Sequence, residues 1–218
     1  SRLRVPMTTP TLLVIWHSRT GAARRLAQAA CSGARAAMRE DADGGVDRVD
    51  DAPQTSCRPA PLVAPCDASP ASPGQSAMRH DASQRPRVRI ECVHASRVDA
   101  QRVCAASAYL FVAPENLAAL SGVMKEFFDR TYYAVLERIA GRPYGIIVAA
   151  GSDGHGAVRQ IERIVTGWRL RSVAEPLVVV TGAQSPAAIA APKRLPPGAA
   201  VKARELGAAL ATGIALGI

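Results

Sequence analysis

The chain has 218 residues, of which 48% are hydrophobic and 21% are charged, and its formal net charge is +9. No apolar run approaches the roughly 18 residues of a membrane-spanning helix, and no charged start precedes an apolar segment as in a secretory signal, so we expect a cytoplasmic protein without a membrane span. The arginines that dominate the positive charge are scattered along the chain rather than clustered, which argues against nucleic acid as the main partner.

Short apolar runs alternate with segments of helical periodicity along the chain. Strands are predicted at residues 11–16, 88–93, 109–113, 145–150 and 177–181, and helices at residues 22–39, 122–139, 157–168 and 199–214. Strands that are apolar throughout are typical of a parallel sheet covered by helices on both faces. The pattern therefore predicts an α/β fold, in which ligands bind beyond the carboxyl ends of the strands.

Residues 41–86 differ from the rest of the chain in composition. They hold seven of the sixteen prolines, seven aspartates and four arginines, and they lack Phe, Trp and Tyr. Such a segment buries too little apolar surface to offset the entropy of ordering it. We expect a flexible insertion at 41–86, a leader or remnant at 1–7, and one domain formed by residues 8–40 and 87–218.

The segment after the first strand has the character of a phosphate-binding loop. It contains Ser18, Arg19, Thr20, Gly21, Ala22 and Ala23 and leads into the first helix. Free N–H groups at a helix start suit an anion. The glycine patterns of triphosphate and dinucleotide loops are absent, which leaves a monophosphate, or a simple helix cap made by Ser18 or Thr20.

Three segments in this order resemble those of a known family. The first loop reads S-x-T-G-x, and Pro114 to Arg130 reads P-x-x-x-x-x-x-S-G-x-M-K-x-F-x-D-R. A glycine-rich loop, Gly151 to Gly154, follows the fourth strand. Together they resemble the flavodoxin-like NADPH-dependent FMN reductases and the tryptophan-repressor-binding-protein-like NAD(P)H:quinone oxidoreductases.

The resemblance implies a three-layer sandwich with a five-stranded parallel sheet in the order 2-1-3-4-5. It also implies an FMN-binding oxidoreductase that passes hydride from NAD(P)H through flavin N5 to a quinone or similar small-molecule acceptor, as a dimer or tetramer. The flavin carries the chemistry, so no catalytic side chain and no metal are expected. The implied cofactor-binding residues are Ser18, Arg19, Thr20, Gly21, Ala22, Ala23, Pro114, Glu115, Asn116, Leu117, Ala118, Gly151, Ser152, Asp153 and Gly154.

Four of these residues depart from the resemblance. Arg19 and Ala23 stand where hydroxyl residues are frequent, although the cation of Arg19 suits a phosphate. Glu115 stands where a small hydroxyl residue is frequent, and a carboxylate near the flavin would disfavour the anionic reduced ring. Leu117 replaces a frequent aromatic residue, so we expect ring stacking to be lost there.

Other functions share parts of this sequence pattern. A flavodoxin-type electron carrier and a family member that has lost its flavin both remain open, although a carrier is usually acidic on its docking face. A serine hydrolase with Ser152 as its nucleophile needs a triad histidine that follows both the nucleophile and the acid in the chain. The last histidine, His155, comes directly after this loop, so the required downstream histidine is missing and this function is excluded. The five cysteines include no C-x-x-C pair and their spacing does not favour a zinc site.

Overall fold

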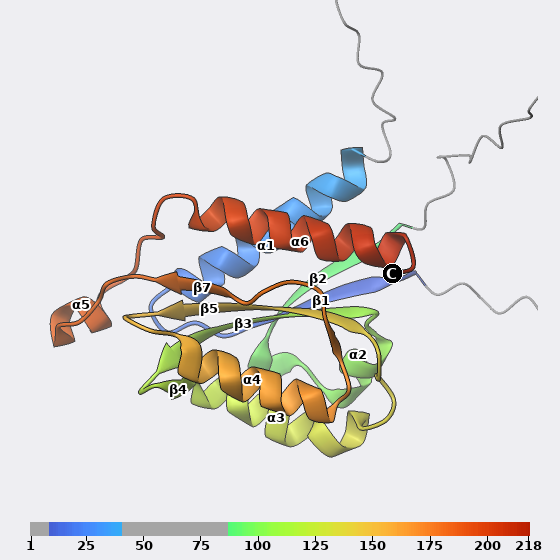
Figure 1. Ribbon diagram of the computed structural model, residues 1–218, viewed down its shortest axis with the longest axis horizontal. Helices are drawn as coiled ribbons and strands as arrows, with labels where there is room; N and C mark the ends of the chain where they lie inside the picture. The colour runs from blue at the N-terminus through green and yellow to red at the C-terminus, as the bar shows by residue number, and fades with distance from the viewer. Residues whose placement is uncertain (1–8, 41–86) are drawn as a thin grey trace, which may run out of the picture.

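The computed structural model describes residues 9–40 and 87–218 (Figure 1). The predicted leader at 1–7 and the predicted insertion at 41–86 lie outside the described residues, so the division of the chain into domain and insertion stays a prediction.

Five strands form the predicted parallel sheet. They are β1 (Thr11–Trp16), β2 (Arg89–His94), β3 (Ala108–Asn116), β5 (Pro143–Ala150) and β7 (Leu177–Val180). The pairings give the order β2-β1-β3-β5-β7, with Leu13 opposite both Glu91 and Tyr109. This is the predicted order 2-1-3-4-5, and the α/β flavodoxin-like fold class is confirmed.

Two additional strands bring the sheet to seven. β4 (Ala119–Leu120) pairs antiparallel with β3, and β6 (Arg171–Ser172) pairs parallel with β5. Each has two residues, which is too short to show the alternation by which a strand is recognised in a sequence. The difference from five strands lies in these short pairings and leaves the order of the main strands unchanged.

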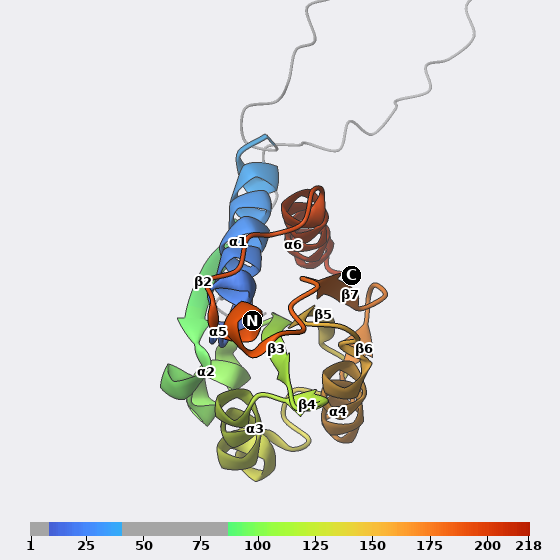
Figure 2. The same ribbon diagram turned by 90° about the vertical axis from the view of Figure 1, so that its left-hand side faces the viewer.

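Helices cover both faces of the sheet (Figures 1 and 2). On one face lie α1 (Ala22–Glu40) and α6 (Ala199–Ala215), and on the other lie α2 (Ala100–Ala105), α3 (Gly122–Val135) and α4 (His155–Gly167). A 3-10 turn, η2 (Ala95–Arg97), precedes α2, and the short α5 (Pro186–Ala190) lies beyond the carboxyl ends of β5 and β7. Because each face is covered, the central strands are buried on both sides.

Burial of the strands follows the sequence pattern. All eight residues of β5 and the four central residues of β1 are buried. Their side chains alternate between two apolar cores, one beneath α1 and α6 and one beneath α3 and α4. The uniformly apolar runs therefore reflect a sheet with no face open to water.

Backbone conformation sets two helix ends that the sequence pattern misplaced. The helix predicted over 122–139 ends at Val135, because Glu137 has a φ of 65° that a right-handed helix does not permit. The helix predicted from residue 157 begins at His155, after Gly154 with a φ of 90°. No helix in residues 9–40 and 87–218 is both long and apolar enough to cross a membrane.

Candidate functional site

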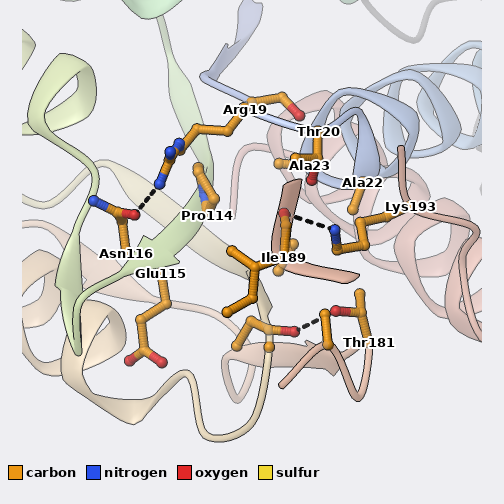
Figure 3. A pocket seen from close by; sticks show the side chains of 15 residues that line it. Arg19, Thr20, Ala22, Ala23, Pro114, Glu115, Asn116, Thr181, Ile189 and Lys193 are labelled. Carbon is orange, nitrogen blue, oxygen red and sulfur yellow. Dashed lines mark hydrogen bonds between the residues drawn. The ribbon is translucent and has the colours of Figure 1, made fainter. Parts of the chain in front are cut away.

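A pocket of about 90 Å³ opens at the carboxyl ends of β1, β3, β5 and β7 (Figure 3). The three segments predicted to bind a cofactor meet there: the loop after β1, the end of β3 and the loop after β5. Nine of the fifteen predicted residues line it: Ser18, Arg19, Thr20, Ala22, Ala23, Pro114, Glu115, Asn116 and Gly151. Loops that are far apart in the sequence thus line one cavity, because the carboxyl ends of parallel strands lie at the same side of the sheet.

The loop after β1 presents the start of α1 to the pocket. The N–H of Gly21 donates to Ser18 Oγ at 3.0 Å, and the N–H of Arg25 donates to the carbonyl of Gly21 at 3.1 Å. The intervening N–H groups, which include those of the buried pocket residues Ala22 and Ala23, have no acceptor among the described residues. Ser18 therefore closes the turn as a cap, while the next N–H groups stay free for an anion.

Two side chains join the loops around the pocket. The guanidinium of Arg19 donates to Asn116 Oδ1 and links the loop after β1 to the end of β3 (Figure 3). The carbonyl of Thr20 accepts a hydrogen bond from the Lys193 N–H at 2.9 Å. The start of α1 is thereby held from both sides.

The segment after β7 supplies pocket residues that the sequence analysis missed. Thr181, Ala183, Ile189 and Lys193 line the pocket beside α5. The ammonium of Lys193 donates to the carbonyls of Ile189 at 2.9 Å and Ala191 at 2.6 Å, so it completes the end of α5. No motif marks this segment, and the one available signal is its position directly after a predicted strand.

Six predicted residues do not line the pocket: Gly21, Leu117, Ala118, Ser152, Asp153 and Gly154. Leu117 is 92% exposed, with a φ of 53° that turns it out of the loop. Asp153 accepts from the N–H of His155 at 3.2 Å, at the start of α4. A Cβ at the pocket residue Gly151 would lie 2.9 Å from the carbonyl oxygen of Ala183, so that position requires glycine.

The carboxylate of Glu115 is turned to α4 rather than toward the loop after β1 (Figure 3). It accepts hydrogen bonds from three backbone N–H groups, those of Gly154, Gly156 and Ala157. From the sequence alone, this carboxylate is expected to place a negative charge near the flavin. Its charge is instead shared with hydrogen-bond donors of a helix start, which weakens the expected repulsion of an anionic ring.

A histidine pair lies beside the pocket. His17, at the end of β1, has its Nδ1 2.9 Å from Ser121 Oγ, and its ring centre is 5.6 Å from that of His94. Burial first, and then the neighbouring His94 and Arg19, lower the pKa of His17 below its ordinary value of 6.5. A neutral imidazole is favoured at this edge of the sheet.

A protein-family model matches part of the chain. Residues 91–185 match the model of the NADPH-dependent FMN reductases. The resemblance to this family is confirmed. The matched range includes the loops after β3 and β5, whereas the loop after β1 lies before it. A comparison with curated proteins finds no match.

Solved structures support the flavodoxin-like fold. An archaeal flavodoxin superposes with a TM-score of 0.57 at 12% identity, over 94% of this chain and 98% of that one. A WrbA-like flavodoxin from Agrobacterium tumefaciens gives 0.55 at 13%, over 95% and 98%. The Flv1 flavodiiron core from Synechocystis gives 0.61 at 12%, over 97% of this chain and 38% of that longer one. At these identities the likeness concerns the fold.

The flavodoxin-like domain has groups that fit the phosphate end of FMN. Free N–H groups at the start of α1 face the pocket, and no carboxylate within it opposes an anion because Glu115 is engaged by α4. Pro114 and Gly151 border the same space with little side-chain bulk. The residues present therefore fit the phosphate of a molecule such as FMN.

Proposed function

We propose that this chain is an FMN-binding oxidoreductase that uses NAD(P)H to reduce a quinone or a similar small-molecule acceptor. The observation that carries the proposal is the open start of α1, which faces a pocket bordered by two further loops of the FMN reductase pattern. When bound, FMN would supply the redox chemistry, and the protein would supply binding and orientation.

The proposed roles follow the position of each loop. N–H groups of Ala22 and Ala23, with the hydroxyl of Thr20, hold the phosphate, and Arg19 contributes positive charge at the pocket mouth. The backbone from Pro114 to Asn116 and that of Gly151 border the flavin ring. The remaining predicted residues, among them Gly21 and Gly154, shape the loops that carry these contacts.

Phosphate recognition can be tested by comparing FMN with riboflavin, which lacks the phosphate. We expect purified protein to bind FMN at least about tenfold more tightly, since charge-assisted hydrogen bonds contribute about 1.5–3 kcal/mol. Thr20→Asp should abolish this preference by placing a carboxylate beside the phosphate. The same carboxylate favours the helix start, so the melting temperature should not fall.

Gln101→Glu is the matched control for this test. It makes the net charge more negative by the same amount at an exposed position of α2, outside the pocket. It should leave both flavin affinities unchanged. Equal affinities for FMN and riboflavin in the wild-type protein, or the absence of flavin absorbance after gel filtration, would contradict the proposal.

Turnover separates an enzyme from an electron carrier. We expect the FMN-loaded protein to oxidise NADPH continuously in the presence of a quinone, measured as loss of nicotinamide absorbance. A net charge of +9 supports this choice, since a carrier usually docks through an acidic face. A flavin-loaded protein without turnover would favour the carrier.

Two further features belong to the proposal. We propose that the protein acts in the cytoplasm, and that its copies associate as a dimer or tetramer, as the family resemblance implies. Leu117 supports the second point, because a large apolar side chain lies 92% exposed on the β3–β4 segment next to pocket residue Asn116.

A further inference from the structure

One carboxylate of the flavodoxin-like domain accepts hydrogen bonds from three backbone groups of a distant helix. Glu115 lies near the end of β3, and its Oε2 accepts from the N–H of Gly154 at 2.8 Å. Its Oε1 accepts from the N–H groups of Gly156 at 3.1 Å and Ala157 at 3.3 Å. These donors belong to the N-cap residue Gly154 and to the first turn of α4. Gly154 has no side chain that could accept a hydrogen bond from them.

The arrangement gives α4 a cap supplied by another strand, here called the Glu115 cap. A carboxylate at a helix start is favoured by the helix dipole, and hydrogen bonds to an ionised acceptor are stronger than neutral ones. A second side chain links the same two segments in the opposite direction, because Gln160 of α4 accepts from the N–H of Leu120 at 2.8 Å. The β3–β4 segment is thus held to α4 at both ends.

The space between these segments permits no side chain. A Cβ at Gly156 would lie 2.0 Å from the carbonyl oxygen of Ala118 and 3.0 Å from Glu115 Oε1. On the other side of the contact, Leu117 and Ala118 adopt φ values of 53° and 55°, which are costly for residues with a Cβ. Such a backbone persists only where surrounding contacts hold it, and these contacts include the Glu115 cap and the hydrogen bond from Arg19 to Asn116.

The same backbone forms one wall of the pocket. Pro114 and Asn116, which flank Glu115, line it, and Gly151 lines it from the loop that leads into α4. We propose that Glu115 is a positioning residue, whose carboxylate fixes the β3–β4 segment against the start of α4 and so sets the two loops that border the ring of a bound flavin. This inference rests on the proposed FMN binding for its functional part.

The first test uses the protein without flavin. Amide hydrogen exchange should become about tenfold faster or more in Glu115→Ala at Gly154, Gly156, Ala157 and residues 117–120, as loss of charge-assisted hydrogen bonds predicts. Exchange in α1 should not change. Glu115→Gln keeps one acceptor oxygen but turns an N–H donor toward the helix start, so its exchange should be intermediate. Unchanged exchange at the start of α4 in both variants would overturn the cap.

The second test uses flavin affinities. Because FMN and riboflavin share the ring, Glu115→Ala should weaken both by the same factor, about tenfold or more, and leave their ratio unchanged. Thr20→Asp should lower that ratio, so the two sites are told apart. Glu115→Gln should restore part of the affinity if the cap positions the loops. Tighter flavin binding by both variants would instead indicate that the charge acts directly on the flavin by repulsion.

Glu91→Gln is the matched control. Its carboxylate forms an ion pair with Arg102 at 3.4 Å. Glu91 belongs to the edge strand β2 and does not line the pocket. It should leave exchange at α4 and both flavin affinities unchanged. If wild-type protein binds no flavin, the proposed function fails while the exchange test still decides the cap. If it binds FMN and the Glu115 variants bind equally well, the positioning role fails alone.

Discussion

His17 shows how a single side chain at the end of a strand makes stability depend on pH. Burial, His94 and Arg19 lower the pKa of His17 in the folded protein. The unfolded chain then binds this proton more tightly than the folded one, so the free energy of unfolding falls as the pH drops below about 6.5. We expect the urea midpoint to be lower at about pH 5.5 than at about pH 8, and His17→Gln to reduce this difference.

The control for this prediction is a substitution that removes no titratable group. Gln101→Asn, at an exposed position of α2, should leave the pH dependence of the urea midpoint as in the wild type. Equal pH dependence in the wild type and in His17→Gln would show that the proton is not linked to folding through this residue.

At this scale the sequence predicts which loops meet but not how their side chains turn. Ser18 and Thr20 were assigned to the pocket from their place between a buried strand and a helix, and they line it. Glu115 was assigned by the same reasoning, yet its carboxylate reaches donors about forty residues later in the chain. That choice depends on how closely α4 packs against β3, which residue order alone does not specify.

Close packing of α1 against α6 limits which residues these two helices can carry at their contact. A Cβ at Gly207 would lie 2.0 Å from the carbonyl oxygen of Ala30, and one at Gly33 would lie 2.1 Å from that of Arg204. Gly207→Ala would therefore push the two helices apart. We expect its free energy of unfolding to fall by about 1–3 kcal/mol, as for other overpacked cores, measured by urea denaturation.

Gly213→Ala is the control within the same helix. Gly213 belongs to α6, but a Cβ there meets nothing within 4 Å. The greater helix propensity of alanine should then stabilise the protein by up to about 1 kcal/mol. Stabilisation by both substitutions would mean that α1 and α6 are not in backbone contact.

Helices and strands were predicted where periodicity is long enough to show. The helices expected at 22–39 and 199–214 agree with α1 and α6 to within one residue. Short elements such as α5 and β4 were not predicted, because a few residues carry no periodic signal. The contact between α1 and α6 also escaped, since glycines 33 and 207 acquire their role only when two helices distant in sequence pack together.

The two ends of the parallel strands carry different parts of the molecule. The pocket lies at the carboxyl ends of the strands, whereas α1 ends and β2 begins at the opposite edge, where Arg89 pairs with Thr11. This division follows from parallel strands joined by helices, and it is why the uniformly apolar strands predict the end of the sheet at which the pocket opens.

The same division predicts the effect of removing residues 41–86. Replacing them by a flexible Gly/Ser linker should change the FMN dissociation constant by less than about twofold, because α1 ends and β2 begins at the end of the strands opposite the pocket. The segment holds seven aspartates and four arginines, so its removal cannot lower the positive charge available to an anion. Flavin fluorescence titration of both proteins measures the constant, and Thr20→Asp provides the weak-binding reference. A shortened protein that folds but loses FMN would place part of the binding site in the removed segment and contradict its assignment to the carboxyl ends alone.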